Sequence, residues 1–150
     1  MIIYGKYGGA ALRAVHLMVE YNYVHADAWD IAITEAFGED VTLGSFKNNP
    51  KVAFLTVCSL GCISCIMPIN YFAARKTRKY VLAALKLLAE KDIAKPINPE
   101  QLWQEVMLAC QSDKAIKHNN QMDVILTLWY AGVLNPESAK NTSNIDCRRI

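Results

Sequence analysis

Residues 48–63, NNPKVAFLTVCSLGCI, lie over residues 119–134, NNQMDVILTLWYAGVL, when the chain is shifted by 71 residues. Both stretches begin with two asparagines, share a Leu-Thr pair, and place a glycine at the same point, Gly61 and Gly132. An apolar stretch that ends at a glycine is typical of a helix stopped by a left-handed residue. Self-similarity at a fixed spacing indicates a repeated structural unit.

Two further matches extend the repeat toward the start of each half. A shift of 70 lays residues 12–20 over residues 82–90, where two leucines, an alanine and a glutamate coincide. A shift of 74 lays Trp29 over Trp103. The matches keep the same order along the chain, which favours a tandem repeat with small loop insertions.

The fold class predicted from apolar spacing is all-α, with six main helices. We expect two tandem three-helix units, about residues 5–67 and 75–134, packed into one compact domain over residues 1–134. A unit of about 60 residues is marginally stable alone, so the two units should share a core. Residues 135–150 are mostly polar and are expected to form a tail. The expected helices cover about 8–21, 28–37, 50–60, 77–90, 99–110 and 121–131.

Asparagine and aspartate side chains give the start signals of these helices. Asp27, Asn49, Asn98 and Asn120 each precede an apolar helical pattern and are expected N-caps. Pro50 and Pro99 follow two of them, at the first helical position where proline is favoured.

Composition limits the class and the compartment. Of 150 residues, 53% are hydrophobic and 20% are charged, which is enough to build a core. A net charge of +2 neither demands nor excludes nucleic acid. The five cysteines are an odd number and three lie within eight residues, which suits thiols in a reducing compartment. With no secretory signal at the start, we expect a cytoplasmic protein.

Several short motifs make the chain similar to a known group. They are Gly5-Lys6-Tyr7-Gly8, Ala28-Trp29, Pro50-Lys51-x-Ala53-Phe54-Leu55, Lys79-Tyr80 and His118-Asn119-x-Gln121-Met122-Asp123-Val124. With these motifs the chain resembles a family of small bacterial proteins catalogued only as a domain of unknown function. The resemblance implies an all-helical fold over most of residues 5–134 and no assigned activity.

Cys58, Cys62 and Cys65 have the C-x3-C-x2-C spacing that holds an iron–sulfur cluster in radical S-adenosylmethionine enzymes. The chain is shorter than the scaffold of those enzymes, and Ser64 stands where an aromatic residue is usual. The repeat also lays Cys58 and Cys62 over apolar positions. We therefore expect buried packing cysteines, no metal and no cofactor, with the three thiols kept as weak metal-ligand candidates.

The polar cluster before the last helix is the candidate for chemistry. His118 and Asp123 could serve as acid and base, or His118 could bind a metal, and Asn119 lies beside them. The alternative is structural: Asn120 caps the helix and Asp123 lies near its positive end. Asn49 holds the equivalent place in the first unit, so these residues are candidate binding residues.

An uncharged run over residues 52–74 ends at four basic residues. Its length and flank match a membrane span, but Pro68 and Asn70 interrupt it, so we do not expect a membrane protein. Residues 75–95 carry a net charge of +5 and could contact phosphates. The candidate contacts are Arg75, Lys76, Arg78 and Lys79.

These observations predict a non-catalytic interaction or regulatory module whose partner, for example another protein, is unknown. One alternative is a nucleic-acid-binding protein that uses the basic segment 75–95. A further alternative is a small enzyme or metal protein built at the His118/Asp123 helix start.

Overall fold

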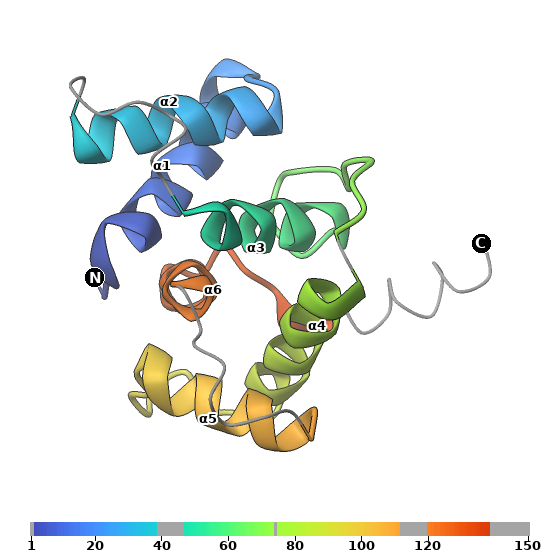
Figure 1. Ribbon diagram of the computed structural model, residues 1–150. Helices are drawn as coiled ribbons and strands as arrows, with labels where there is room; N and C mark the ends of the chain where they lie inside the picture. Colours follow the sequence, from blue (N-terminus) through green and yellow to red (C-terminus); the bar gives the residue numbers. More distant parts are fainter. Residues whose placement is uncertain (1, 39–46, 74, 112–119, 139–150) are drawn as a thin grey trace.

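The computed structural model describes residues 2–38, 47–73, 75–111 and 120–138. These residues are mainly helical and contain no β-strand, which confirms the all-α prediction (Figure 1). The named helices are α1 (Gly5–Tyr21), α2 (His25–Phe37), α3 (Asn48–Ser59), α4 (Arg75–Ala89), α5 (Pro99–Ala109) and α6 (Gln121–Tyr130).

A further helical segment covers residues 136–138, so the expected count of six helices is too small. The sequence Asn135-Pro136 repeats the cap-then-proline signal, and the Asn135 side-chain oxygen accepts a hydrogen bond from the Glu137 amide at 3.2 Å. Pro136 is buried, so the expected polar tail begins against the core. The rest of that tail, residues 139–150, lies outside the described residues.

Helix α6 lies at the centre of the molecule. Every residue from Gln121 to Trp129 is buried, and the helix packs against α1, α3 and α5. Figure 1 looks along its axis, with α3 above it and α5 below it. A helix that is apolar on all sides must be covered on all sides, so the other helices are arranged around this one.

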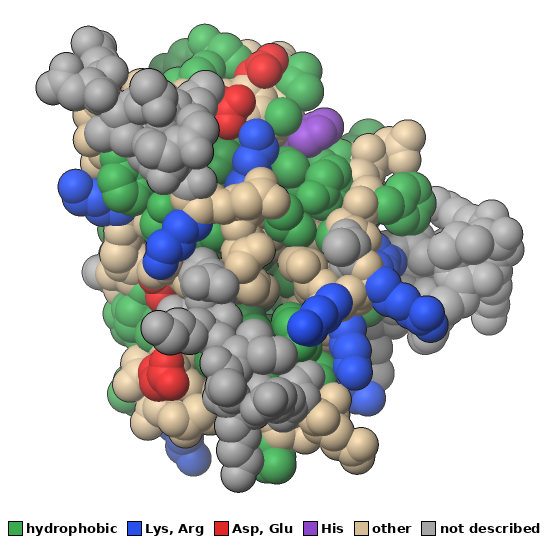
Figure 2. Space-filling model, viewed as in Figure 1, with side chains coloured by type: hydrophobic (Ala, Val, Ile, Leu, Met, Phe, Trp, Pro, Cys, Tyr) green, Lys and Arg blue, Asp and Glu red, His purple; other side chains and the backbone are tan. Residues whose placement is uncertain are grey.

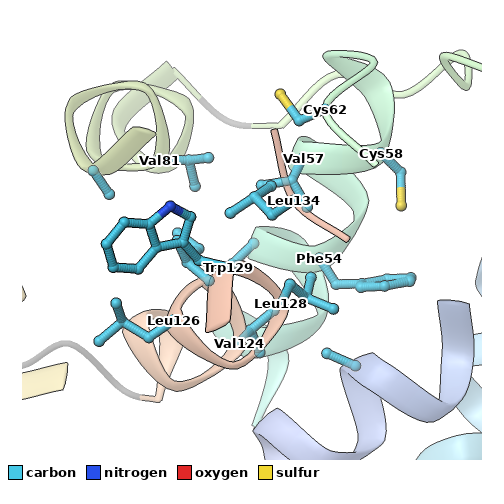
Figure 3. Close-up of a cluster of buried hydrophobic side chains, with 14 of the residues drawn as sticks. Phe54, Val57, Cys58, Cys62, Val81, Val124, Leu126, Leu128, Trp129 and Leu134 are labelled. Carbon is cyan, nitrogen blue, oxygen red and sulfur yellow. The ribbon is translucent and has the colours of Figure 1, made fainter. Parts of the chain in front are cut away.

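The hydrophobic core is one cluster to which all six named helices contribute. Figure 3 shows side chains of α3, α4 and α6 meeting there, with the Trp129 ring on the side of α6 that faces Val81 of α4. On the other side of α3, the Phe54 ring lies 5.2 Å from the Trp29 ring of α2. Trp29, which the sequence comparison lays over Trp103, is therefore buried, as expected for a core position.

The helices pack in a pattern that is the same for the first three and the last three. Helix α1 packs on α2, and α4 packs on α5. Helix α1 also contacts α6, and α4 contacts α3, while α3 and α6 pack against each other. Exchanging α1, α2 and α3 for α4, α5 and α6 leaves this set of contacts unchanged.

The two central helices end in the same way. Gly61 and Gly132 both have a left-handed backbone, with φ of 72° and 78°. The Gly61 amide donates to the Cys58 carbonyl at 3.3 Å, and the Gly132 amide donates to the Trp129 carbonyl at 3.0 Å. A positive φ is accessible to glycine without strain, which explains why glycine ends both stretches.

The chain after α3 pairs with the chain after α6 in one isolated antiparallel bridge. The Ser64 amide donates to the Val133 carbonyl at 2.9 Å, and the Asn135 amide donates to the Cys62 carbonyl at 2.7 Å. These bonds satisfy main-chain groups just after both helices and join the two halves of the chain directly.

The helix starts differ in part from those expected. Asn98 caps α5 and forms a reciprocal capping box with Gln101, as its sequence signal predicts. The N-cap assignments of Asp27 and Asn49 were wrong, since both residues lie inside the first turns of α2 and α3. Asn120 precedes α6 but makes no side-chain cap bond, because its own left-handed backbone (φ 66°) is not the extended geometry of a cap.

The uncharged run over residues 52–74 does not form one helix: it begins in α3 and continues as a non-helical segment after Ser59. Its first part is in α3, which is buried against α6, and the chain leaves the helix at Leu60. Among the helices that the structure describes, none combines the length and apolar character needed to cross a bilayer.

Helix α1 crosses α6 at Gly8. A Cβ atom at this position would overlap the Thr127 side chain and lie 3.0 Å from the Asp123 carbonyl oxygen. The Thr127 hydroxyl also accepts a hydrogen bond from the Tyr4 amide at 2.9 Å, so it cannot move aside without loss. The close approach of the two helices therefore requires glycine at this position.

We predict that Gly8→Ala destabilises the protein by about 1–3 kcal/mol, the usual cost of overpacking a core. Gly9→Ala is the matched control, because a Cβ there meets only Ile3 at 3.6 Å, an ordinary contact. Replacing a glycine inside a helix by alanine stabilises by about 0.5–1 kcal/mol, so this control should raise the melting temperature. Thermal unfolding followed by circular dichroism measures both, and equal shifts would contradict the close crossing.

The Trp103 ring is buried on α5 and meets the Tyr80 ring of α4 edge-on at 5.3 Å. We predict that Trp103→Ala costs about 3–5 kcal/mol, because it leaves a cavity in the shared core. Since the core is one cluster, the loss should shift a single cooperative transition. Unfolding followed by helical circular dichroism and by tryptophan fluorescence tests this, and two separated transitions would show independent halves.

Candidate functional site

Three helix starts meet on one side of α6. The Lys47 ammonium donates to the Asn120 side-chain oxygen at 2.7 Å, which joins the start of α3 to that of α6. The Asn120 side-chain amide donates in turn to Asp123 Oδ2, also at 2.7 Å. The Lys47 backbone amide donates to the Tyr7 hydroxyl of α1 at 3.0 Å. We call Tyr7, Lys47, Asn120 and Asp123 the helix-start junction.

Asp123 has a structural position in this junction. Its carboxylate lies in the first turn of α6, and Oδ2 is 3.5 Å from the position of a Cβ on Gly5, the first residue of α1. Helix α1 has no acidic residue in its own first turn and no side-chain cap. The carboxylate therefore lies near the positive ends of two helices, where negative charge is favoured.

The structure brings together part of the predicted site. Asp123 joins the junction, and Asn49 lies half-buried in the first turn of α3, two residues after Lys47. His118 and Asn119 lie outside the described residues, so their binding role stays a prediction. Sequence reasoning missed Lys47 and Tyr7 as members, although the Gly5-Lys6-Tyr7-Gly8 motif contained the second.

The four predicted cations at the start of α4 have different surroundings. Arg75 and Lys76 are exposed, and Arg78 is half-buried. The Lys79 ammonium donates to the Cys110 carbonyl at 3.3 Å, at the end of α5, where a cation is favoured. Figure 2 shows basic side chains gathered over this part of the molecule. Positive side chains are unfavourable at a helix start, so fold stability does not account for Arg75 and Lys76 there.

The segment just before α4 exposes two large apolar side chains. Met67 is 84% exposed and Phe72 is 71% exposed. Ile66, Ile69 and Tyr71 of the same segment are partly buried against the core. We call residues 64–73 together with Arg75 and Lys76 the apolar–basic surface.

Hydrogen bonds and burial hold this segment in place. The Ile66 amide donates to the Ile63 carbonyl at 3.3 Å, and the Ile69 amide donates to the Cys58 carbonyl at 3.4 Å. Burial raises the pKa of the Tyr71 phenol above its ordinary value. Ile66, Ile69 and Tyr71 anchor the segment to the core, and Met67 and Phe72 are left exposed to solvent.

A groove of about 760 Å³ runs between the α4–α5 connection and α5. Charged and amide side chains dominate its lining, and Lys91 and Glu105 pair across it at 2.9 Å. The opposite charges of Lys91 and Glu105 therefore compensate each other within the groove.

A sequence model of a family of unknown function, DUF6979, matches residues 4–135. The chain belongs to this family. The match covers all six named helices, the helix-start junction and the apolar–basic surface. No curated protein and no solved structure matches the chain.

Membership of DUF6979 confirms the resemblance inferred from the motifs, and it brings no activity with it. The bacterial origin that the resemblance implied stays a prediction. Two of the motif residues have structural roles in this chain: Gly8 allows α1 to approach α6, and Asp123 lies near the starts of two helices.

The three cysteines with the C-x3-C-x2-C spacing differ in burial and orientation in this DUF6979 chain. Cys58 and Cys62 are buried, and Cys65 is exposed with a left-handed backbone. Figure 3 shows the sulfur atoms of Cys58 and Cys62 pointing in different directions. In the part of the chain that the structure describes, no three His, Cys, Asp or Glu side chains are grouped to hold a metal ion.

Burial makes the inner thiols poor nucleophiles and poor metal ligands. It raises the pKa of Cys58 far above its ordinary value, with a smaller contribution from the nearby Cys62, and it raises the pKa of Cys62 to about 12. Both groups therefore stay protonated at neutral pH, whereas the thiolate is the form that reacts and binds metals.

We predict that a thiol reagent at about pH 8 modifies Cys65 first and spares Cys58 and Cys62 until the protein unfolds. Because burial raises the pKa of Cys62 to about 12 and that of Cys58 further still, both groups are protonated thiols at the pH of the reaction. The Cys147→Ser variant removes the thiol that lies outside the described residues. Mass spectrometry of peptides gives the order, with protein in denaturant as the control. Equal rates for Cys58 and Cys65 in folded protein would contradict the burial.

Proposed function

We propose that this chain is a non-catalytic, cytoplasmic interaction module that binds an anionic partner through the apolar–basic surface. The observation that carries the proposal is the joint exposure of Met67 and Phe72 beside Arg75 and Lys76. Isolated exposed apolar side chains are common on protein surfaces, but two large ones in one short segment next to cations are consistent with an interaction site.

The charge around this surface supports an anionic partner. No aspartate or glutamate occurs in residues 41–89, which include the whole segment and all of α4. The first turn of α4 carries no acidic residue, and the positive helix end adds to the potential of the cations. The charge at this position is therefore complementary to phosphate or carboxylate groups.

We also propose that the module consists of two equivalent three-helix units, about residues 5–67 and 75–134. Three observations support this: the exchangeable helix contacts, the matching glycine ends of α3 and α6, and the bridge between Ile63 and Leu134. Ile63 and Leu134 are themselves separated by the shift of 71 residues that the repeat requires.

The repeat makes the exposed segment informative, because the two units differ there. The position equivalent to Ile66 is Glu137, and the position equivalent to Met67 is Ser138. Both units end with a glycine and the same bridge, so the fold itself does not demand an apolar residue at Met67. A role in binding explains the difference.

We propose a non-catalytic role because the candidate reactive side chains are occupied by structural contacts or buried. The Asp123 carboxylate is buried and bonded to Asn120, and the inner cysteines are held as thiols. Free cysteines in close succession along the chain also support a reducing compartment such as the cytoplasm. A nucleic acid is the second candidate partner, favoured by the exposed cations at the start of α4.

We predict that the protein is retained on an immobilised sulfated polyanion, and that Arg75→Gln/Lys76→Gln elutes at a clearly lower salt concentration. Each removed contact lowers the salt dependence of binding because fewer counterions are released. Lys86→Gln/Lys95→Gln is the matched control, since it removes the same charge from exposed positions near the other end of α4. If both double variants elute together, net charge explains retention and the proposal is wrong.

A further inference from the structure

We propose that the apolar–basic surface binds the face of an anionic phospholipid bilayer, with Met67 and Phe72 inserted among the lipids. The cations Arg75 and Lys76 then lie at the level of the lipid phosphates. This inference rests on the proposed function and specifies the chemistry of the partner.

The exposed side chains Met67 and Phe72 of the apolar–basic surface favour lipid over nucleic acid. Single-stranded nucleic acid binds aromatic rings that stack on bases, and Phe72 is the one strongly exposed ring in the described part of this segment. Met67 is the more exposed of the two, and a thioether chain offers no flat face for stacking. Transfer of both side chains from water to hydrocarbon instead lowers the free energy.

The segment and the start of α4 together contain the two components of a membrane-surface anchor, exposed apolar side chains and adjacent cations. An uncharged segment carries the exposed apolar side chains, and cations follow it within a few residues. Anchors of peripheral proteins combine buried apolar area with attraction to anionic lipids in the same way. The insertion is shallow, because Ile66, Ile69 and Tyr71 of the same segment stay packed on the core.

A second group of exposed apolar residues lacks this arrangement. Tyr21 is 63% exposed and Val24 is 57% exposed, at the turn between α1 and α2. Glu20 lies next to them, and residues 14–46 contain no lysine or arginine. This turn is therefore a matched control, with exposed apolar area but no adjacent cations.

The first experiment measures partition of the full chain onto vesicles by co-sedimentation. Vesicles of phosphatidylcholine with about 30% phosphatidylserine should bind the protein, and pure phosphatidylcholine should bind it much more weakly. Met67→Ser/Phe72→Ser should lower the partition coefficient at least about tenfold. Arg75→Gln/Lys76→Gln should lower it by about tenfold or more, with the residual binding less sensitive to salt.

Two controls separate this surface from general effects. Tyr21→Ser/Val24→Ser removes two exposed apolar side chains elsewhere and should leave partition unchanged, as should Lys86→Gln/Lys95→Gln. All the replaced residues are exposed, so an unchanged thermal midpoint verifies that each variant is folded. Equal loss in the control and test variants would overturn the proposal.

The second experiment detects insertion directly through Cys65. This thiol is exposed within the segment, so an environment-sensitive fluorophore can be attached there in a Cys110→Ser/Cys147→Ser background, which removes the partly buried Cys110 thiol as well. Anionic vesicles should shift its emission to the blue and raise its intensity, because the label enters an apolar layer. A label on an Ile93→Cys variant that also carries Cys65→Ser lies beyond the far end of α4 and should not respond.

The outcomes distinguish the two proposals. Binding to the polyanion and to single-stranded RNA without a shift at Cys65 on vesicles would overturn the lipid inference and leave the anionic-partner proposal standing. If the unsubstituted protein binds neither the polyanion nor the anionic vesicles, both proposals are wrong. A vesicle-induced shift that Met67→Ser/Phe72→Ser abolishes would support the lipid inference.

Discussion

The burial of α6 on all sides is the constraint on which the rest of the structure depends. A ten-residue helix with every residue from Gln121 to Trp129 buried cannot be covered by a single neighbour. Helices α1, α3 and α5 must approach it from different directions, and α1 approaches closely enough to require Gly8. The remaining helices, α2 and α4, then pack on the outside of this first layer. One core results, because the same central helix is shared by both halves of the chain.

The same constraint accounts for the polar residues that first suggested chemistry. A central helix must begin somewhere, and its start meets the starts of α1 and α3. The Asp123 carboxylate is buried at this junction and needs a partner, which the Asn120 amide supplies, and the exposed Lys47 ammonium donates to Asn120 in turn. Gly8 and Asp123, two residues of the motifs, are therefore explained by packing and by helix starts. The surface of Met67, Phe72, Arg75 and Lys76 is not explained in that way, and it carries the proposed function.

Features fixed by local chemistry could be predicted from the sequence. The capping box at Asn98, the helix ends at Gly61 and Gly132, and the inward position of Trp103 all follow from neighbouring residues or helical spacing. The caps at Asp27 and Asn49 were mispredicted, because α2 begins at His25 and α3 begins at Asn48, before the residues with the better capping side chains. The helix after Asn135 was missed because its polar composition concealed a cap-then-proline signal.

By itself the sequence determined the all-α fold class and the approximate positions of the main helices, because apolar spacing, caps and glycine stops act over a few residues. The equivalence of the two halves, which the sequence also predicts, stays a proposal. Only the tertiary structure decided which apolar residues of the run 52–74 are core and which are surface. Val57 and Met67 are both apolar residues of the same uncharged run, yet the first is buried in the core and the second is exposed. The difference depends on whether another helix lies opposite the side chain, and that is a property of packing across the chain rather than of local sequence.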